Sequence, residues 1–208
     1  MMRIITGKAK GVRLATLEGD HTRPTTERVK EAVFSMLQFD IEGRTVLDMF
    51  AGSGQMGLEA LSRGAASAVF IDNTKAACDV VRKNIERTHM EAESQIYCGD
   101  FETILQQFSL GKNAKKQFDL VFMDPPYDSG LLKKSIYCLK KYNLIKPSSV
   151  LVCECGKENE TLFDTNAQEN VFEDYLLLKK VRYGVTWIAV LMPKPESIES
   201  RVPSDRCS

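Results

Sequence analysis

Short apolar runs alternate with amphipathic segments along most of the chain. The apolar runs are nearly continuous, which is typical of strands that are buried on both faces of a parallel sheet. They span residues 44–50, 67–72, 94–100, 118–124 and 149–156. The pattern therefore predicts five strands of one parallel sheet.

The segments between these runs have the residue spacing of helices. They span residues 57–64, 75–89, 101–108 and 131–145. In the segment 75–89 we expect one buried stripe, made of Ala76, Val80, Val81, Asn84 and Ile85. Strands that alternate with helices predict an α/β fold with helices on both faces of the sheet.

The pattern changes towards the end of the chain. Residues 174–193 hold two β-rich runs that are broken at Gly184, with no helix between them. This predicts an antiparallel hairpin, which brings the expected sheet to seven strands, most of them parallel. Residues 194–208 are polar and rich in proline and serine, so we expect a disordered tail. The predicted core domain covers residues 41–193.

A separate unit precedes the first strand. Residues 2–15 contain two short β-like runs around a Gly/Lys turn. The sequence Pro-Thr-Thr-Glu at 24–27 is typical of a helix start. The expected apolar face of this helix consists of Val29, Ala32, Val33, Met36 and Leu37. The pattern predicts a small β-hairpin and a helix, which together form an N-terminal extension of residues 1–40.

Composition excludes some classes of protein. The 28 basic and 28 acidic side chains give a net charge of +0, which excludes polyanion binding by the whole chain but allows a local basic patch. No apolar run is long enough to cross a bilayer. The chain has 6 cysteines and no recognisable signal peptide, so we expect reduced thiols in the cytoplasm. With only 2 histidines, we expect no metal site.

A glycine-rich turn joins the first predicted strand to the helix that follows. Gly52, Gly54 and Gly57 have the spacing of a dinucleotide-binding loop, and Asp72 lies 20 residues after Gly52. Glycines in such a turn let a ligand approach the backbone because they lack a Cβ. Alternatively, the motif is a tight turn without a ligand.

Two acids follow the next two strands. Asp72 at the end of the second strand is placed to accept hydrogen bonds from both ribose hydroxyls of a nucleoside. Asp100 at the end of the third strand is placed to accept one from an exocyclic amine. The alternative for each is that it caps the following helix. Two acids beside one glycine loop favour nucleoside binding.

Asp48 distinguishes between possible cofactors. It lies four residues before Gly52, where a carboxylate would repel a pyrophosphate. A zwitterion with an ammonium and a sulfonium group suits this position, and S-adenosylmethionine has both. Alternatively, Asp48 binds only backbone amides of the turn. The predicted cofactor-binding residues are Asp48, Phe50, Ala51, Gly52, Ser53, Gly54, Asp72, Asn73, Asp100 and Phe101.

A second motif, Asp124-Pro125-Pro126-Tyr127, ends the fourth predicted strand. In a doubly wound sheet, the first and fourth strands flank the point where ligands bind outside the carboxyl ends. The prolines hold the chain extended. The Asp124 carboxylate and a proline carbonyl offer two acceptors for one planar amine, and Tyr127 offers a ring for stacking on a base. The alternative is a rigid turn.

This arrangement predicts methyl transfer to an exocyclic amine. The lone pair of such an amine is delocalised into its ring, and two acceptors on its hydrogens favour a pyramidal, more nucleophilic nitrogen. Orientation and electrostatics would then supply most of the catalysis. The predicted catalytic residues are therefore Asp124, Pro125, Pro126 and Tyr127.

The motifs together resemble a known family. "DMFAGSG" with "DPPY", preceded by "RIITGKAKGVRL" and "TRPTTERVKEAVFSML", is similar to the bacterial 16S rRNA guanine-N2 methyltransferases of the RsmD type. The likeness covers residues 2–192. It implies a Rossmann-like class I methyltransferase fold, S-adenosylmethionine as cofactor, and the 2-amino group of a guanine in small-subunit rRNA as target. It also implies action in the cytoplasm.

The N-terminal extension is the predicted RNA-binding unit. Residues 1–17 carry four basic side chains and no acid. The expected phosphate contacts are Arg3, Lys8, Lys10, Arg13, Arg23 and Arg28. A solvated charged face is the alternative. We expect ribosomal RNA, within an assembling small subunit, as the partner of a monomeric protein.

Three other functions fit parts of the pattern. The nearest is methylation of adenine N6 in DNA or RNA by the same fold. The Gly-x-Gly-x-x-Gly loop also fits an NAD-dependent oxidoreductase. A protein that binds RNA without catalysis could keep the fold as well.

Overall fold

The computed structural model describes residues 2–17, 24–37, 41–110, 116–126, 130–156 and 172–195. Three parts of the sequence-based predictions lie outside these ranges: Arg23, Tyr127 and all but the first two residues of the expected tail. Side chains are described from residue 27 onward in the first helix. Within the described residues, no helix is both long and apolar enough to span a membrane.

The elements follow the order that the sequence predicts. The helices are α1 (Pro24–Met36), α2 (Gln55–Ser62), α3 (Lys75–Thr88), α4 (Phe101–Phe108) and α5 (Leu131–Lys141). The strands are β1 (Thr45–Met49), β2 (Ser67–Asp72), β3 (Ser94–Cys98), β4 (Phe118–Met123), β5 (Ile145–Cys155), β6 (Tyr175–Tyr183) and β7 (Thr186–Pro193). The predicted hairpin is therefore β6 and β7.

All seven strands form one sheet in the order β3-β2-β1-β4-β5-β7-β6. The first five pair in parallel, whereas β7 is antiparallel to both β5 and β6. The chain moves from β1 outward to β3 and then returns to place β4 on the other side of β1. This confirms the predicted class I methyltransferase topology, with a switch point between β1 and β4.

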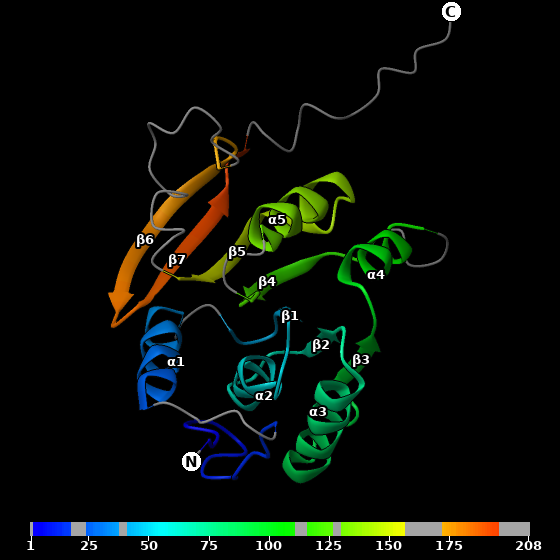
Figure 1. Cartoon of the computed structure of the whole chain (residues 1–208), viewed down its shortest axis with the longest axis vertical. Helices are drawn as coiled ribbons and strands as arrows, with labels where there is room; N and C mark the ends of the chain where they lie inside the picture. The colour runs from blue at the N-terminus through cyan, green and yellow to red at the C-terminus, as the bar shows by residue number, and fades with distance from the viewer. Residues whose placement is uncertain are drawn as a thin grey trace, which may run out of the picture.

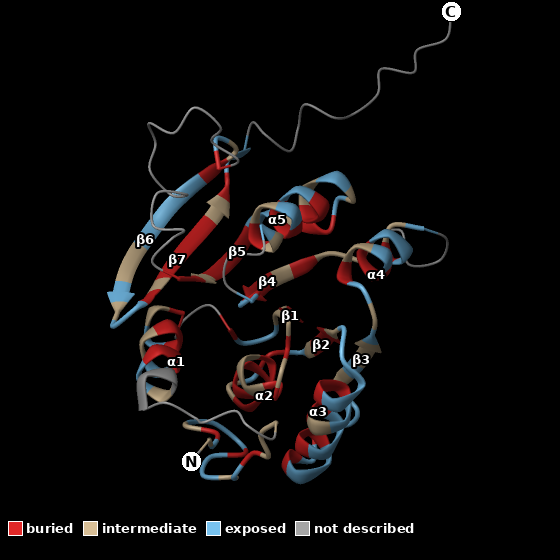
Figure 2. Cartoon of the chain, in the orientation of Figure 1, coloured by how far each residue is buried: buried red, intermediate tan, exposed pale blue. Residues whose placement is uncertain are grey.

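Helices cover the two faces of the sheet as separate layers (Figure 1). The face with α1, α2 and α3 holds one core cluster, in which Leu120, Phe122 and Val152 of the sheet join Phe34 of α1. The opposite face, with α4 and α5, holds a second cluster. Figure 2 shows the central strands buried between these layers, whereas the edge strands β3 and β6 are partly exposed. In β6, leucines 176 to 178 are 40–52% exposed because β6 is an edge strand.

The buried stripe of α3 differs in part from the prediction. Val81, Asn84 and Ile85 are buried as expected, but Ala76 is exposed and Val80 is half-buried. The small residues Ala77 and Cys78 are buried instead, because the Cys78 thiol contacts the Asp72 carbonyl at the end of β2, at 3.6 Å. The buried stripe therefore begins at Ala77 and Cys78 and continues through Val81, Asn84 and Ile85 to Thr88.

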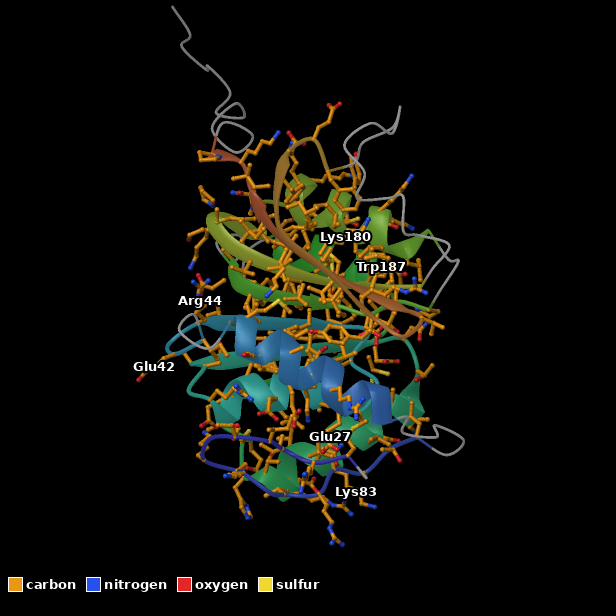
Figure 3. The ribbon with its side chains drawn as sticks, turned by 90° about the vertical axis from the view of Figure 1, so that its left-hand side faces the viewer. Glu27, Glu42, Arg44, Lys83, Lys180 and Trp187 are labelled. Carbon is orange, nitrogen blue, oxygen red and sulfur yellow. The ribbon has the colours of Figure 1, made fainter. Side chains whose placement is uncertain are left out.

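The N-terminal segment folds back on itself around residues 7–11. A single antiparallel bridge joins Arg3 to Arg13, and the Ile4 amide donates to the Val12 carbonyl at 3.0 Å. The segment packs below α1 and α2 rather than standing apart, and α1 separates it from the β6–β7 hairpin (Figure 3). Ile4 and Leu14 belong to the same core cluster as Phe122 of β4. The expected boundary near residue 40 thus crosses a shared core.

A buried carboxylate fixes this segment to the sheet domain. Glu59 of α2 is 0% exposed and accepts from the backbone amides of Ile5 and Thr6, at 2.7 and 3.0 Å. Lys30 of α1, which is 1% exposed, lies 3.5 Å from Glu59 and donates to the Arg3 carbonyl at 2.5 Å. One carboxylate therefore joins α1, α2 and the N-terminal segment.

A buried amide makes the second attachment. Asn84 of α3 accepts from the Ala15 amide at 2.7 Å and donates to the Ala15 and Ser53 carbonyls at 2.9 and 2.8 Å. It is 0% exposed, and all of these bonds satisfy groups that burial would otherwise leave unpaired. Since Ser53 belongs to the glycine-rich turn, Asn84 links the N-terminal segment to that turn.

Replacing Glu59 should strongly destabilise the fold. Glu59→Ala leaves Lys30 buried without its carboxylate and two backbone amides without acceptors, so we expect a loss of about 3–5 kcal/mol in the free energy of unfolding. Urea denaturation measures this loss. As a control, Glu86→Ala changes an exposed residue of α3 and should change stability by less than about 0.5 kcal/mol. Equal effects of both substitutions would contradict the anchoring role of Glu59.

Candidate active site

The carboxyl ends of the parallel strands surround one large cavity of about 580 Å³. This volume is within the range of small-molecule sites, about 300–1,000 Å³. Loops after β1, β2, β3 and β4 contribute to its wall, as the switch point predicts. The lining residues are Leu17, Phe50, Ile71, Asp72, Asn73, Thr74, Ala77, Gly99, Asp100, Phe101, Asp124, Pro125, Pro126 and Leu131.

Asp72 connects two sides of the cavity. One carboxylate oxygen accepts from the Gly52 amide at 2.9 Å, and the other accepts from the amide and hydroxyl of Thr74, both at 2.9 Å. These bonds hold the glycine-rich turn against the start of α3. Since a carboxylate offers about four acceptor sites, two on each oxygen, these three bonds leave one site free, on the oxygen that binds Gly52. Asp72 thus both supports the loop and faces the cavity.

Asp100 caps α4 and lines the cavity at the same time. Its carboxylate accepts from the Thr103 amide at 3.0 Å and from the Thr103 hydroxyl at 3.1 Å. The capping role considered from the sequence is therefore present. It does not exclude ligand binding, because Asp100 is exposed and lies in the cavity wall.

Phe50 lies in the cavity wall with a backbone φ of 64°. Non-glycine residues adopt this left-handed conformation at a cost, which is tolerated where the surrounding structure requires it. Its ring packs on Phe101 of α4, with centroids 5.4 Å apart. The two rings form an apolar floor beside the acids, which suits the face of a nucleobase.

Asp48 makes a backbone hydrogen bond of the kind that the sequence offered as the alternative to cofactor binding. Its side chain is only 4% exposed, and it accepts from the Gly57 amide in the first turn of α2, at 2.8 Å. Burial raises the pKa of Asp48 to about 8, the Gly57 bond opposes this, and the nearby Asp124 and Asp72 raise it further. Asp48 is not among the residues that line the cavity. Its contact with a cofactor stays a prediction.

The remaining residues of the glycine-rich turn, Ala51, Gly52, Ser53 and Gly54, do not border the cavity. A side chain at Gly52 would meet no heavy atom within 4 Å, so one side of this residue is open. At Gly57, by contrast, a Cβ would lie 2.4 Å from the Phe70 ring, so this glycine permits close packing of α2 on β2.

The segment Asp124-Pro125-Pro126 forms the wall opposite the acids. Pro125 is buried, whereas Asp124 and Pro126 are exposed, and all three line the cavity. β4 pairs with β1 up to Met123 and Met49, so Asp124 leaves the sheet beside the turn that begins at Phe50. The structure therefore brings together the two motifs that the sequence singled out. Tyr127 lies outside the described residues.

Several lining residues were missed by the sequence analysis. Leu17, Ile71, Thr74, Ala77, Gly99 and Leu131 contribute mainly apolar surface or backbone. Thr74 had a recognisable signal, since it is the N-cap of α3 and accepts from the Ala77 amide at 3.3 Å. Leu17 had none, because it reaches the cavity only through the Asn84 attachment of the N-terminal segment.

The expected RNA-binding residues lie on the surface. Arg3, Lys8, Lys10, Arg13 and Arg28 are all exposed. Arg3 pairs with Glu27 at 3.1 Å and Lys8 with Glu93 at 2.6 Å. Within the described part of the chain, the other three form no ion pair, so their charges face solvent.

Stability should depend on pH through Asp48. Burial raises the pKa of Asp48 from an ordinary 3.8 to about 8 in the folded protein. The contribution of protonated Asp48 to stability is therefore fully present below about pH 4 and is lost as the pH rises to 8. Asp48→Asn keeps an acceptor for Gly57 without a charge. We expect the stability of this variant relative to the wild type to increase by about 1–3 kcal/mol between pH 5 and pH 8.

Urea denaturation at several pH values measures this difference. The control, Asp79→Asn, changes an exposed residue of α3 and should give a stability difference with little pH dependence. A constant difference between wild type and Asp48→Asn across the pH range would show that Asp48 is ionised normally in the folded protein.

Comparisons with known proteins agree with this geometry. A family model described as "Conserved hypothetical protein 95" matches residues 2–184. Ribosomal RNA small subunit methyltransferase D of Haemophilus influenzae is 32% identical over 188 residues, which cover 88% of this chain and 90% of that protein. The protein of the same name from Escherichia coli is 34% identical over 158 residues, or 76% of each chain.

Solved structures of methyltransferases share the fold of this chain. An Escherichia coli protein described as a methyltransferase superposes with a TM-score of 0.78 at 29% identity, covering 93% of this chain and 98% of that one. A Pyrococcus horikoshii protein described as an RNA methyltransferase shares the fold, with a TM-score of 0.67 at 16% identity. Since the family model and both named relatives match most of its length, the chain belongs to the family of ribosomal RNA small subunit methyltransferase D.

Proposed function

We propose that this protein transfers a methyl group from S-adenosylmethionine to the exocyclic N2 amine of a guanosine in 16S rRNA. The observation that carries the proposal is the placement of the Asp124-Pro125-Pro126 acceptors in the wall of a nucleoside-sized cavity, opposite Asp72 and Asp100. The named relatives act on small-subunit rRNA, which supports this class of substrate. We place its action in the cytoplasm, in keeping with this substrate.

The cavity fits S-adenosylmethionine better than a dinucleotide. Its wall contains Asp72, Asp100 and Asp124, and these carboxylates would repel a pyrophosphate. They suit the hydroxyls, amine and cationic groups of a nucleoside sulfonium. Asp72 is placed to accept from ribose hydroxyls, Asp100 from the adenine amine, and the rings of Phe50 and Phe101 to cover the base. When bound, this cofactor supplies an activated methyl group.

The chain itself would orient and activate the target amine. Asp124 and a proline carbonyl would each accept a hydrogen bond from one N–H group of the amine. This arrangement directs the lone pair of the amine nitrogen towards the cofactor cavity. These acceptors also stabilise the positive charge that develops on nitrogen as the new bond forms. The amine proton leaves after attack, so a strong base is not required. Asp124, in the cavity wall, offers a carboxylate that can accept that proton.

The N-terminal segment would hold the RNA. Its exposed side chains Lys10 and Arg13, and Arg28 of α1, carry positive charge with no ion-pair partner among the described residues. Leu17, the last described residue before position 24, lies in the cavity wall, which supports RNA contacts along this segment close to the site. We propose that these contacts position rRNA within an assembling small subunit, with a single copy of this chain acting alone.

Two substitutions should separate cofactor binding from methyl transfer. Asp124→Ala should retain binding of S-adenosylhomocysteine and reduce methyl transfer to unmodified small subunits by at least 100-fold, about 2.7 kcal/mol in the activation barrier. Asp72→Ala should weaken S-adenosylhomocysteine binding by about 10- to 100-fold, since bonds to a charged acceptor are lost. Calorimetry and transfer of tritiated methyl groups, followed by nucleoside analysis, measure both effects.

The outcome also distinguishes the rival functions. N6-methyladenosine as the product would replace the guanine assignment, and binding of NADH alone would replace the methyltransferase assignment. Methyl transfer that is unaffected by Asp124→Ala would contradict the role of this residue. Because Asp72 also holds Gly52, its variant is first compared with wild type by urea denaturation.

Removing basic side chains should lower the affinity for RNA and make this affinity less dependent on salt concentration. For the double variant Lys10→Ala/Arg13→Ala, we expect weaker binding to small-subunit rRNA and a slope of log K against log salt that is smaller by about 1–2. Filter binding between 50 and about 200 mM salt measures this slope. The control, Lys83→Ala, changes an exposed lysine of α3. Identical slopes for the double variant and wild type would mean that the patch is only a solvated surface.

A further inference from the structure

A second, smaller cavity lies on the other side of Asp124. It is lined by Val29, Lys30, Val33, Gln55, Met56, Phe122, Met123, Asp124, Val152, Glu154 and Ile188. Among the described residues, Asp124 alone lines both cavities, so it lies at the boundary between them. A target amine held by Asp124 would therefore have its nitrogen at the boundary and the rest of its base towards the second cavity.

The strand register places a second carboxyl group beside Asp124. Phe122 pairs with Val152 and Met123 with Cys153 across β4 and β5. The next positions along these parallel strands are Asp124 and Glu154, on strands about 4.8 Å apart. Because side chains alternate between faces, Glu154 lies on the same face as Val152, towards α1. Glu154 and Asp124 therefore border the cavity from adjacent strands.

The other walls leave few polar groups for a ligand. Val29 and Val33 of α1, Met56 of α2 and Ile188 of β7 provide apolar surface. Lys30 is also in the wall, but its ammonium group is already bound by Glu59 and the Arg3 carbonyl. The other polar side chains in the described wall are Asp124, Glu154 and Gln55.

The cavity admits only the edge of a base. Its volume is about 30 Å³, close to the share of one water molecule in the liquid. A purine ring would therefore stay outside, with its hydrogen-bonding edge directed at the two carboxyl groups. The site would therefore distinguish one base from another by the hydrogen-bond donors and acceptors on that edge.

The edges of guanine and adenine differ beside the reactive amine. Guanine presents N1–H, a donor, next to its N2 amine. Adenine presents N1 as an acceptor next to its N6 amine. A carboxylate beside Asp124 can accept a hydrogen bond from guanine N1–H, but it faces the lone pair of adenine N1. A base-edge contact of this kind discriminates between two bases by about 10- to 100-fold.

We propose that Glu154 is a specificity-determining residue that accepts the N1–H of guanine while Asp124 holds the N2 amine. The proposal rests on the function proposed above and deepens it, because it explains why this site takes guanine rather than adenine. Glu154 selects the base; it takes no part in methyl transfer itself.

An analogue of guanosine tests this role directly. 2-Aminopurine keeps the 2-amino group but has an unprotonated N1, which accepts instead of donating. The probes are short RNA hairpins that contain the nucleotide methylated by wild type, made with either guanosine or 2-aminopurine at that position. Wild type should prefer guanosine by about 10- to 100-fold in kcat/KM.

Glu154→Gln should change this preference rather than only lower activity. Its amide can donate to N1 of 2-aminopurine, so the ratio of kcat/KM for the two probes should fall at least about tenfold. Glu154→Ala, which has neither acceptor nor donor, should give an intermediate ratio. The control Glu86→Gln, on the exposed side of α3, should keep the wild-type ratio. Binding of S-adenosylhomocysteine shows that each variant is folded.

The two proposals fail in different ways. If Glu154→Gln and Glu154→Ala both keep the wild-type ratio, Glu154 does not read the base, whatever their absolute rates. If the wild-type product is N6-methyladenosine, the proposed function and the role of Glu154 both fail. If the product is N2-methylguanosine and only the ratio is unchanged, the proposed function stands without Glu154.

Discussion

The reversal of strand order at β1 determines where chemistry can occur in this protein. Strands β2 and β3 extend the sheet on one side of β1, whereas β4 and β5 extend it on the other. Connections therefore diverge from the carboxyl ends of β1 and β4, which in such a sheet opens a crevice between them. The acids after β2 and β3 and the segment Asp124-Pro125-Pro126 all open into that space.

Two acids in the wall of this space, Asp72 and Asp100, also support the loops around it. Asp72 holds the glycine-rich turn, and Asp100 caps α4, while both remain in the cavity wall. Such bonds fix the side chains before a ligand arrives, which reduces the entropy lost on binding. Capping and ligand binding were treated as alternatives in the sequence, but in a carboxylate with several acceptor sites they are compatible.

Much of the fold was predictable because its signals are local. Apolar runs identified the strands, and the break at Gly184 identified the hairpin of β6 and β7. The glycine motif and Asp124-Pro125-Pro126 were also recognisable, since each occupies a few consecutive positions. Glu154 was not, because its place beside Asp124 depends on the register of two strands whose paired residues are 30 positions apart, such as Met123 and Cys153. Leu17 and the role of Glu59 likewise depend on contacts between distant segments.

The attachment of the N-terminal segment has a consequence for the order of events during synthesis. Ile5 needs Glu59, and Ala15 needs Asn84, so the hydrogen-bond partners of the first residues are separated from them by 54 and 69 positions. The first part of the chain to leave the ribosome is thus among the last to gain its contacts, since closing such long loops must wait for α2 and α3. A nascent chain that has not yet folded α2 and α3 therefore lacks the ordered form of the surface that is proposed to hold RNA.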